Sequence, residues 1–323
     1  MRLTAGRRAL ARAGIGLIAC TAMTLGLATS AAAAFRAHGD VVHVVKPHVG
    51  FHTNQSTNWF DYNQGTLEQG SKLFHSISGT WTVPTATQHR SGTAEYSATW
   101  IGIGGGCVSA DCLVPDNTLI QTGTEQDVSS SGKASYSAWW EVIPAPGLDI
   151  NMTVGPGDQM QATIAEVPTN SEVWTITLKN LTGNQTFTTT VPYSSTYGTA
   201  EWIDETPIVV GLDGSGFAAL PNLSRHTFDN GTTNGAPANL KSSEQMQLID
   251  SNSGNVIGAP SAPDGDNDGF ADCAWATSCA SFSSSSGGTT AKKAKHAKKK
   301  GSKKSSKRSK KSRRASARAH RRG

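Results

Sequence analysis

Several segments of the chain alternate apolar and polar residues with a period of two, the repeat of a strand that buries one face. The clearest is residues 172–178, and residues 160–164 and part of 73–78 follow the same repeat. Glycine and asparagine interrupt these segments at intervals of roughly ten residues, and no long amphipathic helix is found. The pattern predicts an all-β fold, built as one antiparallel sandwich.

The N-terminus has the three-part pattern of a secretory signal. Four arginines precede an apolar run at residues 13–28, and a cluster of small residues follows it. We therefore expect residues 1–34 to be a signal peptide. The run is shorter than the ~20 residues of a membrane-spanning helix, so no membrane anchor is expected. The Arg7-Arg8 pair and Cys20 leave twin-arginine export and a lipoprotein cleavage site as lesser alternatives.

Charge divides the remainder of the chain into two parts. All 24 acidic residues lie between positions 35 and 291, together with only eight of the 29 basic residues, which gives this part a formal charge of −16. The segment from residue 292 onward carries 17 basic residues and no acidic one. A domain so poor in lysine and arginine loses self-repulsion as its carboxylates protonate, so its composition suits low pH.

The C-terminal tail, residues 283–323, contains almost no apolar residue and is predicted to be disordered. One interpretation is a solvated extension. Others are adhesion to an anionic cell-wall polymer or to nucleic acid, or an intramolecular cover over the acidic domain. No aromatic residue is interleaved for base stacking, so nothing base-specific is indicated.

Four cysteines remain if Cys20 is removed with the signal. An even number in an exported chain favours disulfides. Among the three possible connectivities we expect local pairs, Cys107 with Cys112 and Cys273 with Cys279. A zinc site is the competing interpretation, but no Cys-x-x-Cys spacing occurs and no histidine lies close in sequence to either pair.

An acidic turn near the C-terminal end of the predicted domain mimics a calcium loop. Asp264, Asp266 and Asp268 take the alternate positions of such a loop, and Asp272 takes the ninth. The twelfth position is Trp275, where a glutamate is required. We therefore expect no metal and no cofactor, with calcium at this turn as the open alternative.

A series of short motifs runs through the chain in a fixed order. They are Ser56-Thr57-Asn58-Trp59, Gly79-Thr80-Trp81-Thr82-Val83-Pro84, Thr99-Trp100-Ile101-Gly102-Ile103-Gly104-Gly105, Leu119-Ile120-Gln121-Thr122-Gly123, Tyr136-Ser137-Ala138-Trp139-Trp140-Glu141-Val142-Ile143-Pro144, Gly157-Asp158 and Ala200-Glu201-Trp202-Ile203-Asp204-Glu205. The series resembles the glutamic peptidase family G1, the eqolisins. The resemblance implies a lectin-like sandwich of two large antiparallel sheets over residues 56–282, and an acid-acting endopeptidase with protein or peptide substrates.

The resemblance also implies a catalytic pair, one glutamine and one glutamate. The family motifs place them at Gln121 and Glu205. In the implied mechanism the glutamate takes a proton from water, the water attacks the peptide carbonyl, and the glutamine amide stabilises the oxyanion, with no covalent intermediate. Glu201 shares a strand face with Glu205. We interpret Glu201 as a neighbour that tunes the site or as a structural residue.

Four further positions match residues that line the family's substrate cleft: Trp59, Trp100, Trp139 and Glu141. For each tryptophan, core packing is the equally weighted alternative. The family's aspartate after Gly-Ile is Gly104 in this chain. This departure leaves the subsite preference and the pH optimum open.

The leader, residues 35–55, is expected to be either a short propeptide or a loose N-terminal strand. The protein is expected to be a secreted, extracellular monomer, with cell-wall association through the tail. The alternative function is a carbohydrate-binding or glycoside-active sandwich, for which Glu141 and Glu205 are the candidate carboxylates.

Overall fold

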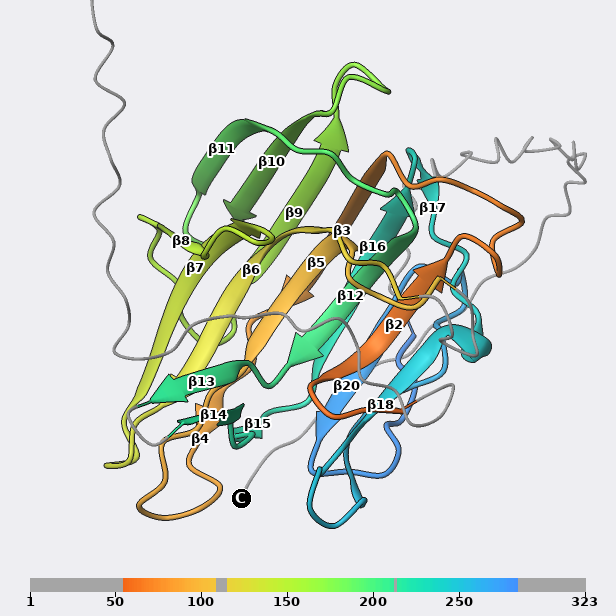
Figure 1. Cartoon of the computed structure of the whole chain (residues 1–323). Helices are drawn as coiled ribbons and strands as arrows, with labels where there is room; N and C mark the ends of the chain where they lie inside the picture. Colours follow the sequence, from red (N-terminus) through yellow and green to blue (C-terminus); the bar gives the residue numbers. More distant parts are fainter. Residues whose placement is uncertain (1–54, 109–114, 212–213, 284–323) are drawn as a thin grey trace, which may run out of the picture. The chain divides into compact units, whose positions relative to one another are not determined.

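The computed structural model describes residues 55–108, 115–211 and 214–283 (Figure 1). Within these residues the secondary structure is almost entirely strand. In chain order the elements are β1 (Gln55–Ser56), β2 (Trp59–Gly65), β3 (Ser76–Thr82), β4 (Ala86–Thr87), β5 (Ala98–Gly104), β6 (Leu119–Val128), β7 (Ala134–Val142), β8 (Leu148–Ile150), β9 (Gln159–Glu166), β10 (Val173–Asn180), β11 (Gln185–Pro192), β12 (Thr199–Glu205), β13 (Ile208–Gly211), β14 (Gly214–Phe217), β15 (Asn222–Leu223), β16 (His226–Thr233), β17 (Ala236–Pro237), the 3-10 helix η1 (Ser242–Glu244), β18 (Gln245–Ile249), β19 (Val256–Pro260) and β20 (Phe270–Ala274).

Most strands belong to one hydrogen-bonded path that folds back on itself. Its order is β11-β10-β9-β3-β16-β20-β19-β18-β2-β12-β5-β6-β7-β8. Strand β18 joins the two halves because it pairs with β19 on one side and β2 on the other. The pairings between the named strands are antiparallel, apart from the short pair β1–β18. The predicted all-β sandwich is confirmed, and its two sheets are continuous through β18.

One apolar core lies between the two halves of this path. Ile77 of β3 and Ile164 of β9 come from one half, and Ile101 of β5 and Trp202 of β12 from the other. Because side chains alternate along a strand, every second residue of β12 and β5 points away from this core, to the opposite face of the sheet. Figure 1 shows β12 between β2 and β5 in this second half.

The alternating segments of the sequence become strands with one buried face. Strands β9 and β10 cover the two clearest predicted segments, and every second residue of β10 is buried. Strand β3 begins at Ser76, later than residue 73 where the alternation starts. Just before it, the backbone N–H of His75 donates to the side-chain oxygen of Asn234 at 2.7 Å instead of joining a ladder.

One predicted disulfide is confirmed, between Cys273 and Cys279, with their Cα atoms 5.4 Å apart. Cys107 is disulfide-bonded as well. Its predicted partner, Cys112, lies outside the described residues, so that pairing stays a prediction.

The predicted signal peptide, nearly all of the leader and nearly all of the tail lie outside the described residues. Their boundaries at residues 34, 55 and 283 stay predictions. No helix among the described residues has the length and apolar character needed to cross a membrane.

Candidate active site

Four strands of the second half bring a row of functional side chains together. Gln121 of β6 is in register with Gly102 of β5, and Gly102 is in register with Glu201 of β12. On its other side Gln121 is in register with Glu141 of β7. Side chains in direct register lie on the same face of a sheet. The row therefore reads glutamate, glycine, glutamine, glutamate, and the glycine places no side chain of its own between Glu201 and Gln121.

Glu201 leans over the glycine. A methyl group built on Gly102 would lie 3.1 Å from Oε1 of Glu201. The Cα atoms of Glu201 and Gln121 are two strand spacings apart, about 10 Å. Both residues are fully buried.

Glu141 orients the amide of Gln121. Nε2 of Gln121 donates to Oε2 of Glu141 at 2.6 Å. An ionised carboxylate only accepts hydrogen bonds, so it holds the amide nitrogen, rather than the oxygen, on its own side. The second N–H and Oε1 are left to interact elsewhere, and Oε1 has no hydrogen-bond partner among the described residues.

Glu201 is in an environment that favours its neutral form. Burial raises its pKa well above the ordinary value, and the nearby carboxylate of Asp116 adds to the rise, while the hydroxyl of Thr199 offsets part of it. A buried glutamate with a raised pKa beside an oriented amide is a typical catalytic arrangement.

Glu205 is not brought to Gln121. It lies four residues along β12, in register with Ala98 of β5, and Ala98 is in register with Glu125 rather than Gln121. Two strand spacings and four residues place the Cα atoms of Glu205 and Gln121 roughly 17 Å apart. The register therefore brings Glu201, rather than Glu205, opposite Gln121 across β5, and the catalytic role predicted for Glu205 stays a prediction.

The indole of Trp100 fills the space between Glu205 and the row. Its Nε1 donates to Oε2 of Glu205 at 2.9 Å. Its Cζ3 atom lies 2.8 Å from the position of a methyl group on Gly102. The ring thus reaches from Glu205 to the position above the glycine, and its hydrogen bond to Glu205 fixes its orientation.

The predicted cleft tryptophans do lie on this face. Trp59 packs edge-on against Trp100, with ring centroids 5.0 Å apart, and Trp139 belongs to the same apolar cluster. All three are buried. The structure therefore shows these tryptophans packed together on the face that carries Gln121 and Glu201, and their role as lining of a substrate cleft stays a prediction.

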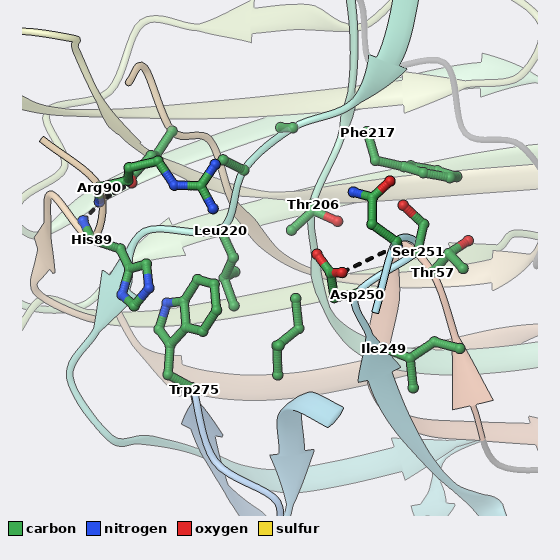
Figure 2. A pocket seen from close by; sticks show the side chains of 15 residues that line it. Thr57, His89, Arg90, Thr206, Phe217, Leu220, Ile249, Asp250, Ser251 and Trp275 are labelled. Atoms are coloured by element: carbon green, nitrogen blue, oxygen red, sulfur yellow. Dashed lines mark hydrogen bonds between the residues drawn. The ribbon is translucent and has the colours of Figure 1, made fainter. Parts of the chain in front are cut away.

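A pocket of about 210 Å³ begins where β12 ends (Figure 2). Thr206, the residue after Glu205, lines it together with Phe217 and Asp250. At the other end of the pocket the ring of His89 stacks on Trp275 with centroids 3.6 Å apart. The pocket combines apolar walls with charged groups.

The acidic turn is divided between two places. Asp264 and Asp268 lie with Asp229, with one oxygen of each within 4.8 Å of the others. Oδ1 of Asp264 accepts the backbone N–H groups of Asp268 and Gly269, as in an ordinary turn. Asp272, assigned to the same loop by spacing, lies instead between the sheets with Asp204 and His226. A calcium loop that includes Asp272 is therefore wrong.

The comparisons with known proteins agree with the fold and the motifs. The model of the Peptidase A4 family matches residues 61–267. A solved structure of scytalido-glutamic peptidase with a transition state analog inhibitor is 21% identical with a TM-score of 0.51, and covers 68% of this chain and 98% of that chain. A second structure of that peptidase, with a peptide-based transition state analog, has the same identity and coverage and a TM-score of 0.50. A search of curated proteins gives no significant match.

The structural likeness shows the fold, and the family match spans well over half of the chain. The chain therefore belongs to the Peptidase A4 family, the glutamic peptidases whose motifs its sequence carries, and it is a glutamic-type peptidase.

Proposed function

We propose that this peptidase is a secreted endopeptidase that cleaves proteins by direct attack of water, with Gln121 and Glu201 as its catalytic pair. The observation that carries the proposal is the register of Glu201 and Gln121 on either side of Gly102. The pair supplies one proton acceptor and one neutral hydrogen-bond donor, and hydrolysis of an amide needs both.

In the proposed mechanism, one water molecule sits above Gly102 between the two side chains. Ionised Glu201 takes a proton from it, and the oxygen attacks the carbonyl carbon of the scissile bond. The free N–H of Gln121 donates to the oxyanion that develops. Glu201 then returns the proton to the leaving nitrogen, and the C–N bond breaks without a covalent intermediate.

Glu141 and Trp100 position the reacting groups in this account. Glu141 accepts one N–H of the Gln121 amide, which fixes the amide and leaves its second N–H for the oxyanion. Trp100, fixed by Glu205, forms the wall against which the peptide backbone lies. The pocket beyond β12 is then available for side chains several residues from the scissile bond, since an extended peptide advances about 3.4 Å per residue.

The pH dependence follows from the raised pKa of Glu201. The base must be ionised, so kcat/KM should rise with pH through a value above the ordinary 4.5 of a glutamate. The acidic domain, with a formal charge of −16, gains self-repulsion as pH approaches neutrality. We therefore place the working range in weak acid rather than near pH 2.

The chain organisation completes the proposal. Residues 1–34 direct export, 35–55 form a leader or short propeptide, 56–282 form the peptidase domain, and 283–323 are a basic tail. The protein acts outside the cell as a monomer. The tail's positive charge fits retention on an anionic cell-wall polymer.

The distance between Glu141 and Glu205 argues against the alternative function of a glycoside-cleaving enzyme. Glu141 and Glu205 lie on β7 and β12, three strand spacings apart, and are offset by four residues. Their Cα atoms are about 20 Å apart. The carboxylates of a glycosidase are separated by roughly 5 to 10 Å, so these two do not form such a pair.

The reaction class is tested by casein hydrolysis between about pH 3 and 7 with the purified secreted protein. We expect cleavage in weak acid that persists with inhibitors of serine and cysteine peptidases and with chelators of catalytic metals. Activity that an inhibitor of serine or cysteine peptidases abolishes would contradict the Gln-Glu mechanism.

Gly102→Ala tests the space between the two catalytic side chains. The added methyl group would lie 2.8 Å from Trp100 Cζ3, 2.9 Å from Leu119 Cδ1 and 3.1 Å from Glu201 Oε1. A displacement of the catalytic base by about 1 Å can lower the rate by on the order of 100-fold. We expect kcat/KM on a peptide substrate to fall by about that factor.

Gly265→Ala is the matched control for this substitution, because a methyl group at Gly265 has nothing within 4 Å. It should leave kcat/KM and the melting temperature unchanged. Full activity of Gly102→Ala, with a melting temperature equal to the parent's, would show that the space above Gly102 is not where the reaction occurs.

A further inference from the structure

A second cluster of ionisable side chains lies inside the sandwich, on the face of β12 opposite Glu201. It consists of Asp61 of β2, Asp204 of β12, His226 of β16 and Asp272 of β20. None of the four is more than 4% exposed. Strands β2 and β12 belong to one half of the path and β16 and β20 to the other. The cluster therefore connects the two layers at a place that the catalytic reaction does not use.

The histidine faces two carboxylates with the same nitrogen. Nε2 of His226 lies 2.9 Å from Oδ2 of Asp204 and 3.6 Å from Oδ2 of Asp272. Its Nδ1 lies 3.3 Å from the carbonyl oxygen of Ser224, which only accepts hydrogen bonds. The ring hydrogen of a neutral His226 is therefore on Nδ1, and its Nε2 presents a lone pair to two negatively charged oxygens. A positive charge is needed between these atoms to hold this arrangement, and either a proton on Nε2 or a bound cation supplies it.

Three carboxylate oxygens of the cluster receive no N–H or hydroxyl hydrogen bond from the described residues: both oxygens of Asp272 and Oδ1 of Asp61. The side chains of Asp61 and Asp272 hydrogen-bond to each other, which needs a proton on one of them. Buried carboxylates without donors or counter-charges are costly, and such groups are typically paired or bound to a metal. Within the described part of the chain, the salt bridges of Asp204 and Asp272 are those with His226.

Asp61 is held in an unusual backbone conformation to reach the cluster. Its φ is 110°, in a region that residues other than glycine rarely adopt. Its Oδ2 accepts the backbone N–H of Asp204 at 2.9 Å. Residues kept in such conformations are concentrated at functional sites and ligand clamps.

The donor set has the composition of a transition-metal site. One imidazole nitrogen and carboxylate oxygens suit zinc, manganese or iron, whereas calcium and magnesium prefer oxygen alone. The three atoms His226 Nε2, Asp204 Oδ2 and Asp272 Oδ2 all lie within 4.8 Å of one another. The outer contacts fit as well: Ser224 O lies at the second nitrogen of His226, and the hydroxyl of Thr99 donates to Oδ1 of Asp204 at 2.5 Å.

We propose that Asp204, His226 and Asp272 bind one divalent transition-metal ion, with zinc as the first candidate, and that Asp61 completes the acidic shell around it. The ion supplies the positive charge that Nε2 faces and neutralises two of the three carboxylates. Its role is structural, since it joins β12 of one layer to β16 and β20 of the other. The proposal is independent of the catalytic pair.

The test is the metal content of the full chain, purified at pH 7 without chelators and measured by inductively coupled plasma mass spectrometry. We expect about one zinc ion per chain. After chelation and dialysis, added Zn²⁺ should restore one equivalent and raise the melting temperature. His226→Gln and Asp272→Asn should lose the ion, whereas Asp268→Asn, which alters the separate acidic group with Asp229, should keep it.

Two outcomes overturn the proposal. The first is a parent with no bound metal and a melting temperature that Zn²⁺ does not change; protons on the carboxylates and on Nε2 then hold the cluster, and the parent melts higher in acid than at pH 7. The second is an ion retained in both cluster variants, which places it elsewhere. If the variants do not fold, the metal content and Zn²⁺ response of the parent decide the question.

Discussion

Replacing Glu201 with glutamine is expected to lower kcat/KM for peptide hydrolysis by about 10³-fold or more. The substitution keeps the size of the side chain and its position over Gly102, but it removes the group that accepts the proton of water. Removal of a general base typically costs 10² to 10⁴-fold, and here the same group also returns the proton to the leaving nitrogen. Steady-state kinetics on a quenched fluorescent peptide measure the change.

The stability of this variant separates lost chemistry from lost folding. The folded-state pKa of Glu201 lies above the ordinary 4.5, so the parent loses stability as pH rises through that raised value. Glutamine has no charge to bury, so Glu201→Gln should melt at or above the parent temperature near pH 7. If the variant is inactive and melts well below the parent, misfolding explains the loss of activity, and the assignment of Glu201 as the base is contradicted.

Replacing Gln121 with alanine is expected to lower kcat by about 10² to 10³-fold and to change KM little. The amide donates to an oxygen that becomes negative only during the reaction, and loss of one such donor has this magnitude. Because the interaction is made in the transition state rather than with bound substrate, the effect falls on kcat. The free energy of unfolding should decrease by about 1 to 3 kcal/mol, since a buried hydrogen bond to Glu141 is lost.

Gln121→Glu is the companion variant for this prediction. It preserves shape, yet it replaces the donor by a carboxylate and directs that carboxylate at Glu141, where the amide contact is now 2.6 Å. We expect a loss of kcat at least as large as that of Gln121→Ala. If either variant instead raised KM and kept kcat, Gln121 would be a substrate-binding residue and the oxyanion role would be wrong.

The all-β architecture could be predicted from the sequence because each strand is encoded by the residues within its own segment. Alternation along residues 172–178 follows directly from one buried face, and β10 formed there. The motif around Gln121 and the motif around Glu201 and Glu205 each fall on the strand that was expected, β6 and β12. Strand identity and facing could be predicted from the order of residues within each segment.

Register could not be predicted, because it depends on how separate segments align. Glu201 and Glu205 share one face of β12, and only the pairing of β12 with β5 and of β5 with β6 brings the first opposite Gln121. Gly102 is the signal that sequence reasoning missed. A glycine centred in a buried strand between the two motifs indicates where side chains from both neighbours meet.

The cluster around His226 was beyond sequence reasoning for the same physical reason. Asp61, Asp204, His226 and Asp272 come from four strands that are distant in the chain, and no spacing rule links them. Spacing instead assigned Asp272 to a calcium loop with its neighbours. The strand β20 separates them, because it carries Asp272 into the interior beside His226 while Asp264 and Asp268 stay in the turn.

The most direct test of the central claim is kcat/KM of Glu201→Gln and Glu205→Gln, measured side by side on one peptide at a single weakly acidic pH. Glu205→Gln keeps a partner for the Trp100 indole, because its amide oxygen still accepts the hydrogen bond. The account predicts that this variant retains at least a tenth of the parent's kcat/KM while Glu201→Gln loses about 10³-fold. The reverse order, an active Glu201→Gln beside an inert Glu205→Gln, would contradict it.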